Sequence, residues 1–147
     1  MTTKKKPVEE ERIYIIIPKI VDVPLRRGRK TLNHHVRMDS RWGAQAVHAA
    51  LLMMDWEDQN IFRAFNKPTI ILSVRNSKEL EKVRCELTEQ AQALDHQGLD
   101  TFMVHEFQDV QPDYWGTPAP VTTAICLSPT RRSVVESIIG HLEKYED

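Results

Sequence analysis

The sequence has little cysteine and no long hydrophobic run. Its only cysteines, Cys85 and Cys126, lie far apart inside predicted regular elements, which indicates reduced, buried thiols rather than a disulfide framework. No apolar stretch approaches the roughly 20 residues that a membrane-spanning helix needs. The lysines that follow Met1 precede neither a hydrophobic stretch nor a small-residue cleavage site. We therefore expect a cytoplasmic protein that does not bind a membrane.

The sequence also lacks the usual metal-binding spacings, since neither an HExxH nor a CxxC pattern occurs. His34 and His35 are adjacent, but neighbouring histidines in a basic stretch are more often solvated than bound to a metal. A single domain of this length buries roughly 70% of the surface that its unfolded chain exposes, so it needs no metal or disulfide to fold. We expect neither a metal nor a cofactor.

The formal net charge is only −1, yet the charges are unevenly distributed. Acidic residues concentrate near the two ends of the chain. Basic residues concentrate in one short stretch, at Arg26, Arg27, Arg29, Lys30, Arg37 and Arg41. Such a patch on a nearly neutral protein attracts phosphates locally. The competing interpretation is a solvated loop without a partner.

Predicted strands and helices alternate along the chain. Strands are predicted at 13–17, 69–74, 101–105 and 122–127, and helices at 41–56, 77–97 and 130–144, with a short extra helix ending near residue 65. A long irregular connection is expected at 18–40 and a loop at 106–121. This order predicts an α/β protein with three layers, in which a four-stranded mixed β-sheet carries helices on both faces. We expect a flexible N-terminus at 1–11 and a single domain at 12–147.

The predicted helix at 41–56 has an apolar and a polar face. Its expected apolar stripe follows helical spacing at Ala44, Val47, Leu51 and Met54, and it is widened by Ala46, Ala49, Ala50 and Met53. Arg41, Gln45 and His48 are spaced i, i+4 and i+7, so they share another face. Because Arg41 falls in the first turn, its guanidinium and the free N–H groups there should attract an anion. The alternative interpretation is that His48 has no chemical role, and that its imidazole is either hydrogen-bonded within the fold or exposed to solvent.

The stretch at 40–49 reads Ser-Arg-Trp-Gly-Ala-Gln-Ala-Val-His-Ala. It resembles the Gly-Lys-x-x-Ala-Gln-x-x-His-Ala signature of the type II peptidyl-tRNA hydrolase family. Gln45 and His48 coincide with that signature, and Arg41 stands in place of its lysine. Two further stretches resemble the family in the same order: 68–99, as its second strand, helix and turn, and 123–142, as its last strand, helix and Gly-His-Leu ending. Three collinear segments support the resemblance far better than one would.

The sequence departs from the family after the third predicted strand. The family carries Asp-Ala-Gly-x-Thr there, whereas this chain has Glu-Phe-Gln-Asp-Val at 106–110 and a longer loop before the last strand. Glu106 retains a carboxylate, with Asp109 and Asp113 as alternatives. The missing threonine has three candidate replacements: Thr117, Thr122 and Thr123. The reaction centre is therefore either rebuilt or lost.

The resemblance implies hydrolysis of the ester that joins a peptide, or an N-blocked amino acid, to tRNA. No serine or cysteine nucleophile stands out, so direct attack by water without a metal is preferred. His48 or Glu106 would act as the base or proton shuttle. Gln45 would orient the water or the carbonyl, and Arg41 would supply charge near a phosphate or the oxyanion.

The partner that the resemblance implies is tRNA. Its backbone would contact the basic residues Arg26, Arg27, Arg29, Lys30 and Arg37, and its bases would stack on Trp42 and Trp115. The alternative interpretation is that the aromatic residues of the proline-rich loop cover the edge of the hydrophobic core. A homodimer is left open. The competing functions on the same fold are a catalytically weakened tRNA- or RNA-binding module and a protein-interaction module.

Overall fold

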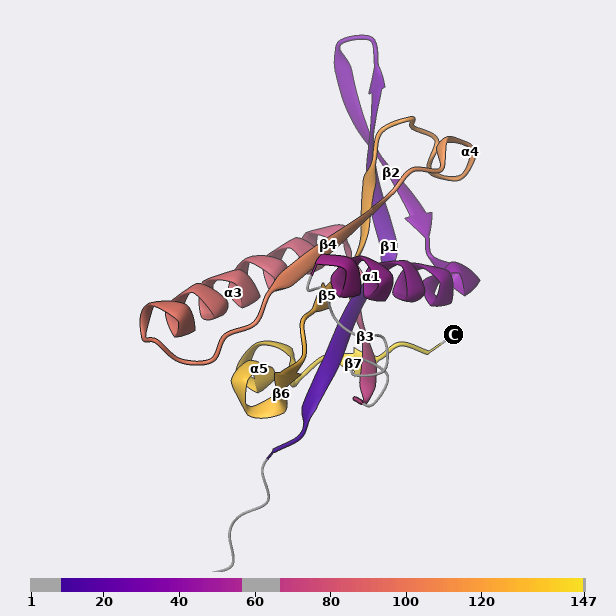
Figure 1. The fold of residues 1–147 in the computed structure, drawn as a ribbon. Helices are drawn as coiled ribbons and strands as arrows, with labels where there is room; N and C mark the ends of the chain where they lie inside the picture. The colour runs from indigo at the N-terminus through magenta and orange to yellow at the C-terminus, as the bar shows by residue number, and fades with distance from the viewer. Residues whose placement is uncertain (1–8, 57–66, 147) are drawn as a thin grey trace, which may run out of the picture.

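A computed structural model describes residues 9–56 and 67–146, and these residues form a mixed β-sheet with helices on both faces (Figure 1). The strands are β1 (Glu11–Arg27), β2 (Lys30–Arg37), β3 (Thr69–Asn76), β4 (Val104–Asp109), β5 (Val121–Leu127), β6 (Thr130–Arg131) and β7 (Glu143–Lys144). The helices are η1 (Asp39–Arg41), α1 (Trp42–Trp56), α3 (Ser77–His96), α4 (Pro112–Trp115) and α5 (Arg132–Ile139). The predicted short helix ending near residue 65 lies outside the described residues.

The sheet of the described chain has seven strands, not the four expected. Its main order is β4-β5-β1-β3-β7, with β2 and β6 paired to β1. The four predicted strands are consecutive in this order, with β4 at one edge, while β2, β6 and β7 are additional. The pairing of β1 with β3 is parallel, and its pairings with β2, β5 and β6 are antiparallel, so the sheet is mixed as predicted.

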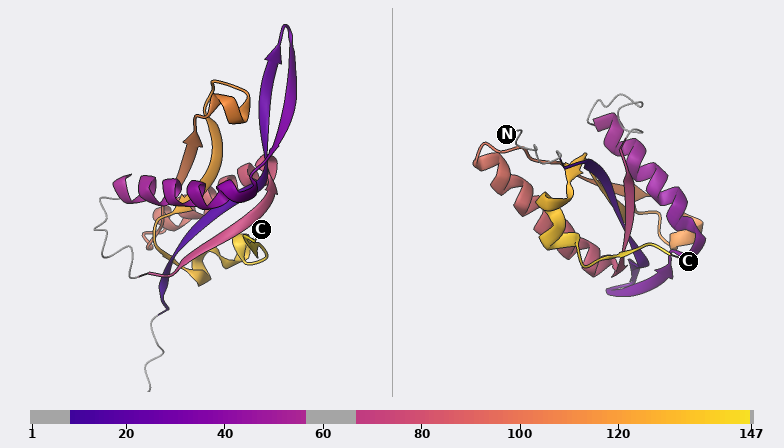
Figure 2. Two further views of the ribbon diagram at one scale, coloured as in Figure 1. Left: turned by 90° about the vertical axis from the view of Figure 1, so that its right-hand side faces the viewer. Right: turned by 90° about the horizontal axis from the view of Figure 1, so that it is seen from below.

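Strand β1 separates the two halves of the hydrophobic core because its side chains alternate between the two faces of the sheet. Ile13, Ile15 and Ile17 pack with α1 on one face, whereas Tyr14 and Ile16 pack with α3 and α5 on the other. Figure 2 shows α1 on one side of the sheet and α3 with α5 on the opposite side. The predicted three-layer arrangement follows from this alternation.

The expected irregular connection at 18–40 is wrong, because most of it forms an antiparallel hairpin of β1 and β2. Beyond residue 20 the hairpin leaves the sheet, and β1 pairs only with β2. Gly28, with a φ of 63°, begins the two-residue turn between Arg27 and Lys30. The hairpin and the β4–β5 arm that carries α4 extend from the same end of the molecule (Figure 1).

Helix α1 buries only one part of the wide apolar stripe that was predicted. Its buried side chains are Gln45, Ala46, Ala49 and Met53, whereas Val47 and Leu51 are 58% and 54% exposed. Small alanines let α1 approach the sheet closely, so the larger Val47 and Leu51 lie on the outer surface. The prediction is therefore confirmed for Ala46, Ala49 and Met53, with Ala50 and Met54 packed at the edge of the core, and wrong for Ala44, Val47 and Leu51.

Two other boundaries differ from those expected. Strand β4 begins at Val104 and continues to Asp109, so it occupies the start of the predicted loop. Helix α5 ends at Ile139 rather than near Lys144. After it the chain turns at Gly140, where an added Cβ would lie 2.5 Å from the Glu136 carbonyl oxygen, and β7 then pairs with β3.

Candidate active site

The first turns of α1 place Gln45 between the two strands β4 and β5. Gln45 is only 1% exposed, and both ends of its amide are hydrogen-bonded. Its Nε2 donates to Asp109 Oδ2 at 3.1 Å, and its Oε1 accepts from Thr123 Oγ1 at 2.5 Å. A buried amide needs such partners, because an unpaired buried polar group is costly. Gln45 therefore joins α1 to both strands.

Asp109 ends β4 and forms the next link in this network. Its side chain is buried, and Oδ2 also accepts from Trp115 Nε1 at 3.2 Å. Trp115 is completely buried beside α1, so the short helix α4 is fixed to the same carboxylate. These two donors to the carboxylate, an amide and an indole, are both neutral. We call Gln45, Asp109, Trp115 and Thr123 the buried polar cluster.

Arg41 lies at the start of α1 and is held by the loop that carries α4. Its Nη1 donates to Gln111 Oε1 at 2.9 Å, and its guanidinium carbon lies 3.2 Å from the centre of the Tyr114 ring. The Tyr114 hydroxyl donates to the Arg37 carbonyl at 2.5 Å. Arg41 is therefore a partly exposed cation with a fixed position, next to the end of the hairpin.

His48 is exposed and stacks on Phe107 of β4, with 5.3 Å between ring centres and 13° between planes. Phe107 precedes Asp109 by two positions, with a bulge in the β4–β5 pairing between Phe107 and Gln108. Arg41, Gln45 and His48 thus contact β4 and the loop after it from one side of α1, as the helical spacing predicts. Arg41 and His48 are accessible, whereas Gln45 is enclosed.

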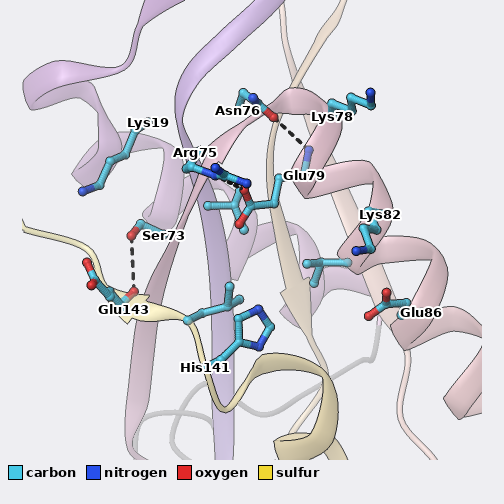
Figure 3. Close-up of a pocket in the computed structure, with 13 residues that line it drawn as sticks. Lys19, Ser73, Arg75, Asn76, Lys78, Glu79, Lys82, Glu86, His141 and Glu143 are labelled. Carbon is cyan, nitrogen blue, oxygen red and sulfur yellow. Dashed lines mark hydrogen bonds and ion pairs between the residues drawn. The ribbon is translucent and has the colours of Figure 1, made fainter.

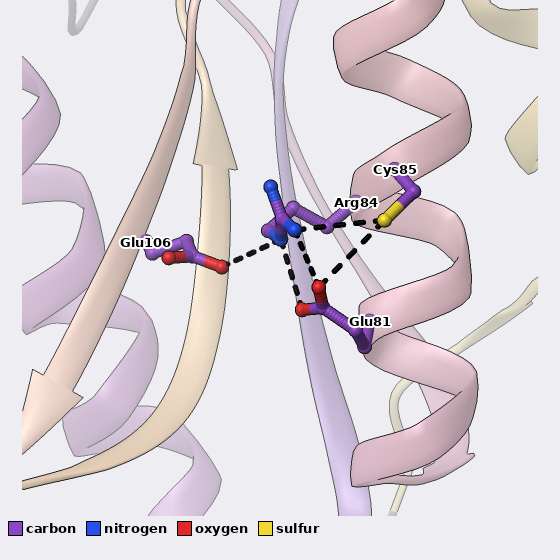
Figure 4. A network of polar contacts seen from close by, with 4 residues as sticks. All are labelled: Glu81, Arg84, Cys85 and Glu106. Carbon is purple, nitrogen blue, oxygen red and sulfur yellow. Dashed lines mark hydrogen bonds and ion pairs between the residues drawn. The ribbon is translucent and has the colours of Figure 1, made fainter.

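Glu106 does not join these residues. Its side chain leaves the opposite face of β4 and reaches α3, where Oε1 lies 2.8 Å from Arg84 Nε (Figure 4). Arg84 also pairs with Glu81, and these carboxylates raise the pKa of the guanidinium, with the Glu81 hydrogen bond as the largest cause. The same hydrogen bond lowers the pKa of Glu81. The carboxylate beside Gln45 is Asp109, which the sequence offered as an alternative to Glu106. Of the three candidate threonines, Thr123 is the one that contacts Gln45.

The residues predicted to bind nucleic acid lie in different surroundings. Arg29 and Lys30 are exposed at the tip of the hairpin, Arg26 and Arg27 precede its turn, and Arg37 is exposed at its base. Trp42 is partly buried and stacks on Tyr145, with 5.0 Å between ring centres. Trp115 is fully buried and so cannot stack on a base in this conformation, which contradicts its predicted role.

Sequence reasoning missed Gln111 as the partner of Arg41 and Trp115 as a donor to Asp109. The alternation of β4 puts Phe107 and Asp109 on the side of α1 and Glu106 on the other side. The bulge, whose extra residue is Thr123 of β5, places Thr123 on the α1 side together with its neighbour Ala124. The prediction that both cysteines are buried holds for Cys126, whose burial raises its pKa to about 12. It fails for Cys85, which is exposed.

Within residues 9–56 and 67–146, no set of three or more histidine, cysteine, aspartate or glutamate side chains is grouped to hold a metal ion. In the same part of the chain, no helix has both the length and the apolar character needed to cross a membrane.

A family model matches most of the chain. The family model described as peptidyl-tRNA hydrolase PTH2 matches residues 33–145, which include α1, β4, β5 and the whole buried polar cluster. The match begins inside β2, so the whole of β1 precedes it. No curated protein sequence matches the chain. Because the family model covers well over half of the sequence, the chain belongs to the type II peptidyl-tRNA hydrolase family.

Proposed function

We propose that this chain hydrolyses the ester bond between tRNA and a peptide or an N-blocked amino acid, by attack of water and without a metal. The observation that carries the proposal is the buried polar cluster, which lies between Arg41 on one side and His48 on the other. The family membership supports a peptidyl-tRNA hydrolase function in general. The assignment of individual residues below is part of the proposal.

His48 is the proposed base because its imidazole is exposed and Glu106 is engaged with Arg84. The imidazole takes a proton from water as the water oxygen attacks the ester carbonyl carbon. The negative charge that develops on the carbonyl oxygen is stabilised by Arg41. The carbon–oxygen bond to the ribose then breaks, and the proton from His48 passes to the leaving ribose oxygen. The products are a free peptide carboxyl group and tRNA.

Asp109 and Thr123 are positioning residues in this proposal. They hold the two ends of the Gln45 amide, and Gln45 in turn would orient the water or the carbonyl. Because Gln45 is enclosed, the proposal requires that the residues covering it move when the substrate binds.

A turnover assay with N-blocked aminoacyl-tRNA tests the proposal. We expect His48→Ala to lower kcat/KM by roughly 10²- to 10⁴-fold, the usual contribution of a general base. Glu106→Gln is the matched control, because Glu106 is a carboxylate of the same strand on the other face. It should change kcat/KM by no more than about 2-fold. Loss of activity in Glu106→Gln with full activity in His48→Ala would overturn the assignment.

The proposed substrate contacts outside the reaction centre are the basic residues of the hairpin, together with Trp42. We infer that Arg26, Arg27, Arg29, Lys30 and Arg37 contact the phosphates of tRNA, since the exposed positions of Arg29, Lys30 and Arg37 suit a backbone contact. A cytoplasmic location, a single domain at 12–147 and a homodimer remain predictions. Cell fractionation, limited proteolysis and sedimentation would check them.

The second candidate function is a tRNA- or RNA-binding module with weakened chemistry. The observation that favours it is the enclosure of Gln45, whose amide is hydrogen-bonded at both ends within the fold. The turnover assay separates the two functions when binding is measured in parallel. tRNA that is bound without release of the N-blocked amino acid would support the module and exclude the hydrolase.

A further inference from the structure

A cavity of about 880 Å³ lies at the carboxyl end of β3, between the first turns of α3 and the turn that precedes β7 (Figure 3). This volume is within the usual range of roughly 300–1,000 Å³ for ligand sites. Val74, Val83 and Leu142 form apolar parts of its lining, and charged side chains form most of the rest. In open α/β sheets, ligands commonly bind near the carboxyl ends of parallel strands.

The charges around this cavity, which we call the α3 cavity, have a positive excess of one. Four cationic side chains line it, Lys19, Arg75, Lys78 and Lys82, against three carboxylates. Arg75 is engaged with Glu79, with Nε and Oε2 2.8 Å apart. Lys19, Lys78 and Lys82 form no ion pair with another described residue. The cavity therefore presents three ammonium groups outside any ion pair, from the two elements β1 and α3, against two remaining carboxylates, Glu86 and Glu143.

Two of these lysines lie on one face of α3. Lys78 and Lys82 are separated by four positions, and like charges with this spacing repel each other on a helix. An anion placed between them would relieve that repulsion. Lysine ammonium groups bind phosphate as point charges without a fixed geometry, which suits a backbone contact of any nucleotide sequence.

The α3 cavity is linked to Arg41 through the base of the hairpin. The Lys19 carbonyl accepts from the Met38 N–H at 2.9 Å, and the Met38 carbonyl accepts from the Arg41 N–H at 3.1 Å. On the other side, the Asp22 N–H donates to Ser77 Oγ at 2.8 Å, which ties the hairpin to the first residue of α3. One polyanion that passes the base of the hairpin can therefore contact Arg41 and the cavity together.

We propose that the α3 cavity holds a backbone phosphate of the tRNA whose ester end lies at Arg41. This inference rests on the proposed function, and it adds a phosphate site on the face of the sheet opposite the buried polar cluster. Lys78 and Lys82 are the principal contacts, and Lys19 lies on the side toward Arg41. The site positions the tRNA and takes no part in the hydrolysis step.

The test compares wild type with the double variant Lys78→Ala/Lys82→Ala and with a charge-matched control, Arg131→Ala/Arg132→Ala. The control removes the same charge from the end of the sheet where β6 pairs with the start of β1. The Kd for tRNA is measured at several salt concentrations. We expect the lysine variant to bind roughly 10-fold more weakly at moderate salt, and its plot of log Kd against log[salt] to flatten by about 1 to 2 units. The control should change Kd by less than about 3-fold.

Two further measurements separate this inference from the proposed function. The lysine variant should cleave an N-blocked aminoacyl ester of adenosine as fast as wild type, because that substrate has no tRNA body.

Equal salt dependence in wild type and lysine variant would overturn the cavity inference even if hydrolysis is normal. Absence of hydrolysis in wild type, with the expected change in salt dependence, would overturn the hydrolase proposal and leave the phosphate site. Binding of adenosine monophosphate that needs the lysines, with tRNA affinity unaffected by their removal, would overturn the tRNA assignment.

Discussion

At the scale of single residues, the candidate site depends on a glutamine that is buried rather than displayed. Gln45 makes one hydrogen bond as donor and one as acceptor, so a single side chain fixes the distance between α1, β4 and β5. Replacement of one partner leaves the other group buried without a hydrogen bond, and such a loss is more costly than the net value of the bond itself. The cluster should therefore respond strongly to small changes.

Thr123→Val tests this directly, since valine has nearly the shape of threonine but no hydroxyl. We expect a loss of about 1–3 kcal/mol in the free energy of unfolding, because Gln45 Oε1 would lose its buried donor. Urea unfolding measures the change. Thr122→Val is the control on the adjacent, partly buried residue, and it should change stability by less than about 1 kcal/mol. Equal losses of unfolding free energy in both variants would show that the hydrogen bond to Gln45 does not contribute to stability beyond what the neighbouring threonine contributes.

The sequence predicted that Arg41, Gln45 and His48 form one group, but it did not decide which residues contact them. The spacing of Arg41, Gln45 and His48 depends only on helix geometry, and the structure places all three toward β4 and the loop after it. The choice between Glu106 and Asp109 depends on where β4 ends. The strand was predicted to end at residue 105, whereas it continues to Asp109 and its alternation puts Asp109 on the side of α1. The bulge places Thr123 on that side as well, and it cannot be predicted from periodicity.

At the scale of elements, the hairpin of β1 and β2 is the main feature that the sequence did not predict. Pro18, Pro24 and Gly28 are typical of turns, so they concealed the alternation of Val21, Val23 and Leu25. In the structure Pro24 lies in the arm that pairs only with β2, where one edge of the strand has no ladder partner and the missing N–H is tolerated. The three apolar residues pack toward the α1 side of the core.

Shortening this hairpin tests its proposed role. Val23 and His34 are partners in the ladder, so residues 24–33 can be replaced by an Asn-Gly turn that joins them. We expect the fold to persist because buried Val21 and Val23 remain. Affinity for tRNA should fall, and the plot of log Kd against log[salt] should flatten by about 3 units, because four basic residues are removed. Anisotropy titrations over a range of salt measure both.

The control for the hairpin keeps its length and removes its charge. Arg26, Arg27, Arg29 and Lys30 are replaced together by glutamine. If the phosphate contacts depend on charge, this variant should match the shortened one in both affinity and salt dependence. Wild-type binding in the glutamine variant would exclude the hairpin cations as tRNA contacts.

At the scale of the whole molecule, the sheet separates two polar systems that were expected to be one. The buried polar cluster lies on the side of α1, and the pairing of Glu106 with Arg84 lies on the side of α3. The α3 cavity is on this second side as well. A substrate that uses both must pass around the end of the sheet from which the hairpin extends, and this arrangement favours a long polyanion over a small ester.

The start of the described chain is joined to α5, and this contact makes stability depend on pH. Glu9 accepts hydrogen bonds from Ser133 Oγ at 2.5 Å and from the Ser133 N–H at 2.8 Å, so it caps the first turn of α5. The hydrogen bond from the Ser133 hydroxyl is the largest cause that lowers the pKa of Glu9 from its ordinary value of 4.5. An anion at a helix N-terminus is favourable in addition.

Because the pKa of Glu9 is lower in the folded chain than in the unfolded chain, its carboxylate stabilises the fold at pH values above 4.5. This stabilisation is lost as the pH falls below 4.5 and passes through the lowered pKa. We therefore expect Glu9→Gln to have a lower Tm than wild type at pH 7, and the difference to shrink steadily as the pH falls below 4.5. Thermal unfolding followed by circular dichroism over this range measures the difference in Tm.

Glu10→Gln removes the same charge from a neighbour that makes no hydrogen bond to the described residues, so its Tm should follow that of wild type at every pH. A difference between Glu9→Gln and wild type that stays constant down to acid pH would mean that the carboxylate does not cap α5.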